Sequence, residues 1–471
     1  SSSVNVEKWY GRSVYFVVTD RFAKSDESAD SAPPCMGKDW CGGTLKGVTR
    51  KLDYVQSMGF DAIWITPVVK QVDWKDYWNG TGFHGYWAQD FFKIDPHFGT
   101  EDDLLELKRE CKKRGMLLML DVVANHVGPI HSLEHIKALG EGLNSVNGEQ
   151  FHQLDRKPNQ SLYEYMHDPA TWLDESDACW PMYNWNAGCN YTLIEKGWYG
   201  DLADLNQDNP ETREYLLKWI SYMAKKYSAD GFRLDTALYL PKWFLEAFQK
   251  ASGTFMIGEV ITHNFTVHRS FSPSLTGILN FPVTEHLNSV FGKNGSMVDM
   301  QRLLKHQQSM DYPYENLLGN FVDNHDRDRF LYNQSGDLSR LRNGLAWTML
   351  YHGLPIIYYG TEQEEVSNRK DERLSMWPHF GQTDTYEFLA KLNALRKEFG
   401  LAAGGEDPKL HAVPLSATTN NFAFVRGKLL ILLTNSGLGR QTRMCINLNS
   451  LPLPWMDACS GHSVETVLSD A

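Results

Sequence analysis

Three acidic residues follow or end separate apolar runs of the sequence. Asp235 ends GFRLD, Glu259 lies in FMIGEV, and Asp326 follows LLGNFVDN. Cleavage of a glycosidic bond needs one carboxylic acid to protonate the leaving oxygen and one carboxylate to attack the sugar or to activate water. An acid placed in an apolar environment is costly unless it has partners or a function. These residues therefore predict glycosidic chemistry, although a helix cap or a salt bridge is the alternative for any single one.

A cation and several histidines accompany these acids. Arg233 precedes Asp235 by two residues, so we expect both side chains to leave the strand on the same side and the guanidinium to keep the carboxylate ionised. Glu259, close to other negative charge in a site with little water, would have a raised pKa and suit a general acid. Histidines near strand ends, which could bind sugar hydroxyls or have a purely structural role, are His84, His126 and His325.

Eight short apolar runs predict the strands that must position these side chains. They alternate with amphipathic helical stretches, a pattern typical of a parallel α/β architecture. The runs are VYFVV from Val14, AIWIT from Ala62, LLMLDVV from Leu117, GFRLD from Gly231, FMIGEV from Phe255, GILNF from Gly277, LLGNFVDN from Leu317 and PIIYYG from Pro355. Eight strands close a (β/α)8 TIM barrel, whose active site forms at the carboxyl ends of the strands.

Helix boundaries are indicated clearly in two places. In TEDDLLELKRECKKRG, Thr100 is the predicted N-cap, Asp103 occupies the capping-box position, and Gly115 ends the helix. In PETREYLLKWISYMAKKYSADG, Pro210 suits the first helical turn and Gly231 restarts the chain as a strand. These helices lie between predicted strands, as the barrel requires.

Two stretches depart from the strand–helix alternation. Residues 127–203 lack steady periodicity and are too long for a loop, so we expect an inserted subdomain after the third strand. Residues 401–471 contain short alternating runs such as NFAFVRG and LLILLTN, which predict a C-terminal antiparallel β-sandwich domain. The barrel would then comprise residues 1–126 and 204–400.

Bulk composition excludes several classes of partner. A net charge of −12 argues against binding of nucleic acid, because proteins that bind nucleic acid usually carry a basic surface patch. No window approaches 18 uninterrupted apolar residues, and the first ten residues lack the apolar core of a signal peptide, so we expect a mature chain outside the membrane. The 15 tryptophans and 21 tyrosines indicate surfaces on which sugars stack, with core packing as the alternative for each.

The cysteines and glycosylation motifs favour a secreted protein. Short-range cysteine pairs suggest disulfides, because no CxxC motif or zinc-ligand spacing is present. The pairs are Cys35 with Cys41, Cys179 with Cys189, and Cys445 with Cys459, and the seventh, Cys111, is a predicted buried free thiol. Candidate N-glycosylation sites begin at Asn79, Asn159, Asn190, Asn264, Asn294 and Asn333.

Four motifs together resemble the α-amylase family of glycoside hydrolases, glycoside hydrolase family 13. They are DVVANH at 121–126, GFRLDT at 231–236, GEV at 258–260 and FVDNHD at 321–326, in the order and spacing of the family's recurrent regions. Further agreement comes from LADLN at 202–206, TDRF from Thr19, FHGYW from Phe83 and GLPIIYYG from Gly353. The resemblance covers roughly residues 10–400 and is strongest to secreted fungal α-amylases, including their short disulfide pairs.

The resemblance implies a retaining enzyme that hydrolyses internal α-1,4-glucosidic bonds in starch, glycogen and maltooligosaccharides. Asp235 would be the nucleophile, Glu259 the acid and base, and Asp326 the carboxylate that stabilises the transition state. Tyr86 would stack on the sugar at the cleavage point. The residues implied in substrate binding are His84, Tyr86, Trp87, His126, Arg233, Leu238, Tyr239, His325 and Arg373.

The resemblance also implies a Ca²⁺ site that joins the inserted subdomain to the barrel. Asn125, Asp204 and the backbone carbonyl of Tyr239 would be ligands, since calcium prefers hard oxygen donors. The remaining protein ligand is not assigned. We expect the protein to act as a monomer.

One pair of residues departs from the family pattern. The second motif of family members usually continues with a Lys-His pair that contacts the leaving-group sugars, and here Leu238 and Tyr239 occupy those positions. Tyr239 could stack on a sugar acceptor and so favour transglycosylation. An α-glucan transglycosylase, or a relative that releases short products, is therefore the alternative function, and a non-catalytic carbohydrate-binding protein is a remote one.

Overall fold

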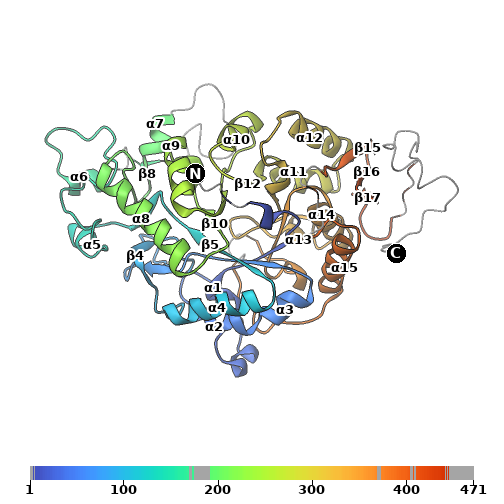
Figure 1. Ribbon diagram of the computed structural model, residues 1–471, viewed down its shortest axis with the longest axis horizontal. Coiled ribbons are helices and arrows are strands. Elements are labelled where there is room, and N and C mark those ends of the chain that lie inside the picture. Colours follow the sequence, from blue (N-terminus) through green and yellow to red (C-terminus); the bar gives the residue numbers. More distant parts are fainter. Residues whose placement is uncertain are drawn as a thin grey trace.

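A closed barrel of eight parallel strands forms the centre of the computed structural model (Figure 1), with neighbours in the order β1-β14-β13-β12-β11-β10-β5-β2. The described residues are 4, 6–168, 172–173, 191–368, 373–403, 407, 410–440, 442 and 444. The barrel strands are β1 (Val14–Val17), β2 (Ala62–Ile65), β5 (Leu117–Val122), β10 (Gly231–Leu234), β11 (Phe255–Gly258), β12 (Gly277–Leu279), β13 (Leu318–Asn320) and β14 (Leu354–Tyr358). Each overlaps one of the eight predicted runs, which confirms the barrel.

The register of the barrel brings the acidic residues to one rim. Arg233 on β10 lies beside Asp121 on β5 and beside Ile257 on β11. Asp235 and Glu259 come directly after these strands, and the backbone N–H of Glu259 donates to the carbonyl of Leu234 at 2.9 Å. Parallel strands present their carboxyl ends at the same edge, so the side chains after β10 and β11 face a common space.

Helices pack around the outside of the barrel (Figure 1). They are α1 (Thr19–Phe22), α2 (Leu45–Arg50), α3 (Leu52–Ser57), α4 (Glu101–Lys113), α8 (Pro210–Lys226), α9 (Lys242–Ser252), α10 (Phe265–Phe271), α11 (Phe281–Phe291), α12 (Met297–Ser309), α13 (Phe330–Asn333), α14 (Leu338–Leu350) and α15 (Asp384–Glu398). Thr100 caps α4 in a reciprocal capping box with Asp103, and Pro210 begins α8, so both predicted helix starts are confirmed.

Short 3-10 helices and one hairpin occupy connections between barrel elements. They are η1 (Glu7–Trp9), η2 (Glu27–Ser31), η4 (Ala237–Tyr239), η5 (Glu315–Leu317), η6 (Thr361–Gln363), and the antiparallel strands β3 (Val69–Gln71) and β4 (Ala88–Ile94). The η4 turn comes directly after the Asp235 motif and thus borders the rim that holds the acids.

The segment after the third barrel strand forms a small sheet in the order β6-β9-β8-β7. Its elements are β6 (His126–Pro129), α5 (Leu133–Lys137), α6 (Leu162–Met166), β7 (Trp172–Leu173), α7 (Tyr191–Lys196), β8 (Trp198–Tyr199) and β9 (Leu202–Asp204). The first and last strands pair, with His126 opposite Asp204, so the segment begins and ends at the barrel rim. Its exact limits, 127–203, stay a prediction.

An antiparallel sheet follows the barrel, as predicted for the C-terminal domain. It contains β15 (Val413–Ala417), β16 (Asn421–Arg426) and β17 (Leu429–Thr434) in that order. The guanidinium of Arg426 donates to the backbone carbonyl of Tyr351 at 2.8 Å, which ties the sheet to the loop before β14. The limits of this domain, 401–471, stay a prediction.

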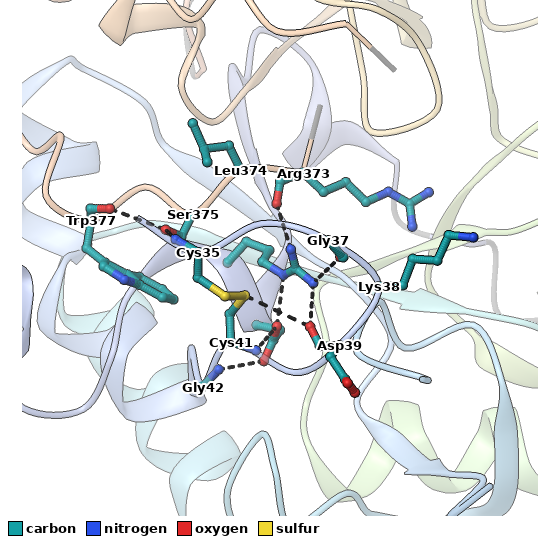
Figure 2. Close-up of a disulfide and its surroundings, with 12 residues drawn as sticks. Cys35, Gly37, Lys38, Asp39, Cys41, Gly42, Arg373, Leu374, Ser375 and Trp377 are labelled. Atoms are coloured by element: carbon teal, nitrogen blue, oxygen red, sulfur yellow. Dashed lines mark hydrogen bonds and ion pairs between the residues drawn. A yellow bond between two sulfur atoms is a disulfide. The ribbon is translucent and has the colours of Figure 1, made fainter. Parts of the chain in front are cut away.

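Cysteine chemistry agrees with the predictions within the described residues. Cys35 and Cys41 form a disulfide with a Cα–Cα distance of 5.8 Å (Figure 2). Cys111 is a buried free thiol, and burial raises its pKa to about 12. The predicted pairs Cys179 with Cys189 and Cys445 with Cys459 lie outside the described residues.

Four of the six candidate glycosylation asparagines are solvent-exposed, namely Asn79, Asn159, Asn294 and Asn333. Asn264 is half-buried and caps α10 through its side-chain oxygen, and Asn190 lies outside the described residues. Among the helices that the structure describes, none is long and apolar enough to cross a membrane.

Candidate active site

Arg233 is the centre of the acidic cluster. Its side chain is 0% exposed, its Nη1 donates to Asp235 Oδ1 at 2.6 Å and to Asp121 Oδ1 at 3.1 Å, and its Nη2 lies 2.5 Å from Glu259 Oε1. Three carboxyl groups from three adjacent strands therefore surround one guanidinium. The expectation that Arg233 and Asp235 point to the same side of the strand is confirmed.

Glu259 is held as a buried acid. It is 3% exposed, and its Oε2 accepts a hydrogen bond from the backbone N–H of Thr236 at 2.9 Å. Thr236 has φ +47°, a left-handed conformation that is rare for a β-branched residue and that helps aim this N–H at the carboxyl. Burial raises the pKa of Glu259 to about 8; Arg233 opposes the rise, and the charge of Asp235 adds to it. Glu259 is therefore protonated at neutral pH, as a general acid must be.

Asp326 has the opposite electrostatic environment. Its carboxylate accepts from Arg373 Nη2 at 2.8 Å and lies 3.3 Å from His325 Nε2, with 31% of the side chain exposed. Burial by itself would raise the pKa of Asp326, but His325, Arg373, Arg233 and Arg327 outweigh that effect and hold it below its ordinary value. Asp326 is therefore available as a fixed negative charge.

Asp121 belongs to the cluster although we did not single it out from the sequence. It accepts hydrogen bonds from the Tyr86 hydroxyl at 2.8 Å and from Trp64 Nε1 at 3.1 Å, in addition to Arg233. Burial raises the pKa of Asp121 to about 7, and Arg233 opposes the rise. The signal for it was an acid inside the apolar run LLMLDVV, which needs a partner on a neighbouring strand. Asp121 fixes Tyr86 and Arg233 relative to each other.

Aromatic and imidazole rings form one wall of the site. Tyr86 stacks on His325 with ring centres 5.3 Å apart, and the Tyr86 N–H donates to His84 Nδ1 at 3.0 Å. The half-buried Trp87 contacts His84 edge-on at 4.6 Å. Burial lowers the pKa of His84, of His126 and of His325, the last to about 3. These rings are therefore neutral and suited to hydrogen bonds with hydroxyl groups.

Arg373 is positioned by a second arginine from the other end of the chain. Arg21 donates from Nη1 to the carbonyl of Arg373 at 3.0 Å and from Nη2 to the carbonyl of Asp39 at 2.7 Å. Figure 2 shows these carbonyls beside the Cys35–Cys41 disulfide. Arg373 in turn donates from Nε to the carbonyl of His325 at 3.0 Å. The disulfide loop thus supports the arginine that binds Asp326.

The two residues that depart from the family pattern lie next to the acid. Leu238 is buried, and its N–H donates to the backbone carbonyl of Glu259 at 3.2 Å. Tyr239 is also buried, and burial together with nearby Tyr199, Glu259 and Asp235 raises its pKa. Both predicted positions therefore border the site on the side of Glu259.

The predicted calcium ligands adjoin the site at the base of the inserted segment. Asn125 Oδ1 is buried and accepts no hydrogen bond from the described residues. The buried carboxylate of Asp204 bonds His152 Nδ1 at 2.6 Å, and burial raises its pKa to about 6. An unsatisfied amide oxygen beside a carboxylate is the hard-oxygen chemistry that Ca²⁺ requires, so these residues fit the ion.

A separate carboxylate–imidazole cluster lies between the barrel and the C-terminal sheet. Glu315 lies 2.9 Å from His352 Nε2 and 3.1 Å from His411 Nδ1, and the three ligand atoms lie within 4.8 Å of one another. His352 Nδ1 accepts the N–H of Ala412 at 3.0 Å, so the proton of the neutral ring lies on Nε2 and is directed at Glu315. This arrangement suits an ion-pair network better than a metal site.

A closed parallel barrel with paired carboxyl groups at its carboxyl rim has the acidic groups that cleavage of a glycosidic bond requires. The family model for the catalytic domain of alpha amylase matches residues 16–397, and the chain belongs to this family of glycoside hydrolases.

Individual relatives agree with this assignment. Alpha-amylase 1 of Lipomyces kononenkoae is 35% identical over 82% of this chain and 58% of its own length. Alpha-amylase 2 of Schwanniomyces occidentalis is 32% identical over 83% of this chain and 72% of its own. The structure of an alpha-amylase from Malbranchea cinnamomea superposes with a TM-score of 0.77 at 31% identity, covering 91% of this chain and 86% of that one. The chain thus spans little more than half of the first of these relatives.

Proposed function

We propose that this protein is an α-amylase that hydrolyses internal α-1,4-glucosidic bonds of starch, glycogen and maltooligosaccharides with retention of configuration. The observation that carries the proposal is the set of carboxyl groups around Arg233, in which Glu259 has a raised pKa. A protonated acid next to an ion-paired carboxylate provides both partners that glycosidic cleavage requires. The named relatives are α-amylases, which supports the choice of substrate.

The first step forms a covalent intermediate. Asp235 attacks the anomeric carbon while Glu259 gives its proton to the glycosidic oxygen, so the C–O bond to the leaving sugar breaks and a glycosyl ester of Asp235 forms. In the second step Glu259, now a carboxylate, takes a proton from water. The resulting hydroxide attacks the same carbon, the ester bond breaks, and Asp235 is released as a carboxylate.

The geometry favours retention over inversion. Asp235 and Glu259 bind two nitrogens of the same guanidinium, so their carboxyl groups are close neighbours. Retaining enzymes place these groups about 5–5.5 Å apart, whereas inverting enzymes need about 6.5–9.5 Å to admit a water molecule. Asp326, held by Arg373, would bind hydroxyls of the bound sugar and stabilise the positive charge that develops on it.

Substitution of Glu259 tests the proposal. Glu259→Gln removes the proton donor with little change of shape, and starch hydrolysis should fall by about 10²–10⁴-fold. Glu106→Gln, a change at an exposed glutamate on α4, is the matched control and should leave activity unchanged. Equal turnover by Glu259→Gln and the parent would contradict the mechanism and favour a non-catalytic carbohydrate-binding protein.

The transglycosylase alternative is tested by product analysis on maltoheptaose. It rests on Tyr239, whose phenol lies close enough to Glu259 and Asp235 to interact electrostatically with them. A hydrolase should produce only shorter oligosaccharides from the start. Early appearance of chains longer than the substrate would establish transfer to a sugar acceptor.

We also propose a calcium site, secretion, domain limits and an oligomeric state for this protein. Asn125, Asp204 and the Tyr239 carbonyl would hold Ca²⁺, which would join the inserted segment to the barrel. The disulfide Cys35–Cys41 and the exposed sequons support a secreted glycoprotein. We further propose domain limits of 1–126 with 204–400, 127–203 and 401–471, and a monomeric state.

A further inference from the structure

Arg21 is a fully buried arginine that binds the main chain of two distant segments. It belongs to α1, which follows β1, and it is 0% exposed. Its Nη2 donates to the carbonyls of Gly37 at 2.9 Å and Asp39 at 2.7 Å, and its Nη1 donates to the carbonyl of Arg373 at 3.0 Å (Figure 2). Burial of a guanidinium is costly unless its donors are satisfied. Arg21 therefore fixes the loop at 37–39 and the segment of Arg373 relative to each other.

Asp20 and the Cys35–Cys41 disulfide hold Arg21 in this position. Asp20 Oδ2 accepts from Arg21 Nε at 2.9 Å and from the N–H of Cys41 at 2.8 Å. At the other end of the disulfide, the N–H of Cys35 donates to Ser375 Oγ at 2.8 Å, and the carbonyl of Cys35 accepts the N–H of Ser375 at 2.8 Å. The disulfide thus links the segment of Ser375 to the loop that surrounds Arg21 (Figure 2).

Arg21 supports two walls of the active site. Through the carbonyl of Arg373 it holds the residue whose Nη2 donates to Asp326 Oδ1 at 2.8 Å. Its guanidinium also lies 3.7 Å from the ring centre of Phe83, and the Arg373 guanidinium lies 5.9 Å from the same ring. Phe83 in turn contacts the ring of His84 edge-on at 5.1 Å. One buried side chain therefore places the arginine that binds Asp326 and the aromatic ring next to His84.

A salt bridge with Asp20 alone would not explain this arrangement. Such a pair needs none of the three backbone carbonyls that Arg21 binds. Arg373 also repels Arg21, since burial lowers the pKa of Arg21 and the charge of Arg373 adds to this lowering, whereas Asp20 opposes it. The side chain of Arg373 is 23% exposed, and a long side chain loses conformational freedom when it is held in one position. The hydrogen bond to its carbonyl therefore fixes the base of a side chain that would otherwise move.

We propose that Arg21 is a positioning residue for glycosidic cleavage, which acts through Arg373 to hold Asp326 where it stabilises the transition state, and that the Cys35–Cys41 disulfide keeps Arg21 in place. The choice of reaction rests on the proposed function. Reacting groups must be held to within about 0.5 Å by side chains that are themselves fixed by their neighbours. Loss of Arg21 should therefore lower kcat more than it changes KM, because the interaction of Asp326 with the sugar is strongest in the transition state.

A double-mutant cycle on the full chain tests whether Arg21 acts through Arg373. Arg21→Met should lower kcat/KM for maltoheptaose about tenfold, mostly through kcat. In the Arg373→Met background, the same change should cost no more than about twofold, because the connection to Asp326 is already broken. Losses that multiply, with about tenfold from Arg21→Met in both backgrounds, would overturn the proposal.

Arg396→Met is the matched control. Arg396 is another buried arginine that donates to backbone carbonyls, those of Met349 at 2.6 Å and Gly11 at 2.9 Å. Gly11 precedes β1 and Met349 precedes β14, so these bonds lie at the opposite end of the barrel from the acids. Arg396→Met may be destabilised to the same degree as Arg21→Met, but it should change kcat/KM less than about twofold and by the same factor in the Arg373→Met background.

Hydrogen exchange separates this proposal from the proposed function, because it needs no substrate. The N–H of Met376 donates to the carbonyl of Arg21 at 2.7 Å, and the N–H of Ser375 donates to the carbonyl of Cys35. In Arg21→Met and in Cys35→Ser/Cys41→Ser, these two amides should exchange about tenfold faster than in the parent, and in Arg396→Met they should not. This result supports the positioning role even if the parent does not cleave glucans, in which case only the proposed function fails.

The cysteine variant keeps the test decisive if Arg21→Met does not fold, with unfolding temperature as the check. Cys35→Ser/Cys41→Ser leaves every charged group of the site in the chain. Its kcat/KM for maltoheptaose should be about fivefold below the parent, and the change should cost less than about twofold in the Arg373→Met background. Parent-like exchange of Ser375 and Met376 in the folded variants, with cleavage intact in the parent, refutes the positioning role alone.

Discussion

Replacement of Glu259 by glutamine should make the protein less active and, at alkaline pH, more stable. Glu259 is almost fully buried, and its pKa rises from 4.5 to about 8 in the folded chain. Between those two pH values the folded chain therefore binds a proton that the unfolded chain has released. The stability of the parent protein falls as pH rises through this window, because folding then opposes ionisation.

The size of the effect follows from the pKa difference. Each pKa unit corresponds to about 1.36 kcal/mol, so well above pH 8 the ionised Glu259 costs the folded state on the order of 5 kcal/mol. Glutamine has nearly the same shape and never ionises. The free energy of unfolding of Glu259→Gln relative to the parent should therefore be near zero at about pH 4 and should rise toward this value at about pH 9.

Urea unfolding at several pH values measures this difference, and starch hydrolysis measures the accompanying loss of activity. In the parent, kcat/KM should also decline above about pH 8, where Glu259 loses its proton. Glu315→Gln is a control of opposite sign, because His352 and His411 outweigh burial and lower the pKa of Glu315 to about 2. That variant should lose stability between about pH 4.5 and the raised pKa of His411, above which the imidazole is neutral, and should approach the parent toward pH 2. A Glu259→Gln protein whose relative stability did not change with pH would refute the reasoning.

Three further predictions concern other parts of the site and fold. Arg373→Met removes the hydrogen bonds to Asp326 and to the His325 carbonyl and should lower kcat/KM for maltoheptaose by about 10–100-fold, while Arg302→Met, at an exposed arginine, should not. Parent-like kinetics of Arg373→Met would contradict this role. A calcium chelator should lower both Tm and activity, and added CaCl₂ should restore them; an unchanged Tm would remove Asn125 and Asp204 from a calcium site. Glu315 raises the pKa of His411, so this ion pair contributes stability below the ordinary histidine value and loses it as pH rises through the folded pKa. His411→Asn should therefore destabilise the protein at about pH 5 but hardly at about pH 9, and an equal loss at both would rule out the ion pair as the cause.

The barrel was predictable because its strands are short, apolar and separated by helices with clear capping signals. Thr100 and Asp103 form the expected capping box of α4, and Pro210 begins α8 as expected. Such helix-start signals are predictable because they act within a single turn. The shared direction of Arg233 and Asp235 was likewise predictable, because alternation along a strand needs only the sequence spacing.

Other parts of the site depend on contacts between distant segments. The pairing of Asp121 with Arg233 depends on the register between β5 and β10, which the sequence alone does not specify. The hydrogen bond between Arg21 and the Arg373 carbonyl joins positions 352 residues apart, so no local sequence pattern predicts it. The roles of the individual residues, the calcium ligands and the domain limits stay predictions, because they depend on a bound sugar or metal ion and on boundaries that no local sequence pattern marks.

Barrel closure has a consequence for the order in which this protein can become functional during its synthesis. β1 lies between β2 and β14, and Phe16 on β1 contacts the ring of His325 at 5.0 Å. The free edge of β1, the first strand to be synthesised, is therefore covered only when β14, the last barrel strand, has been synthesised. A nascent chain on the ribosome would already carry Asp235 and Glu259 long before β14 emerges. Glucan cleavage should begin only after the residues around Tyr358 have left the exit tunnel, and shorter nascent chains would expose the edge of β1 to chaperones.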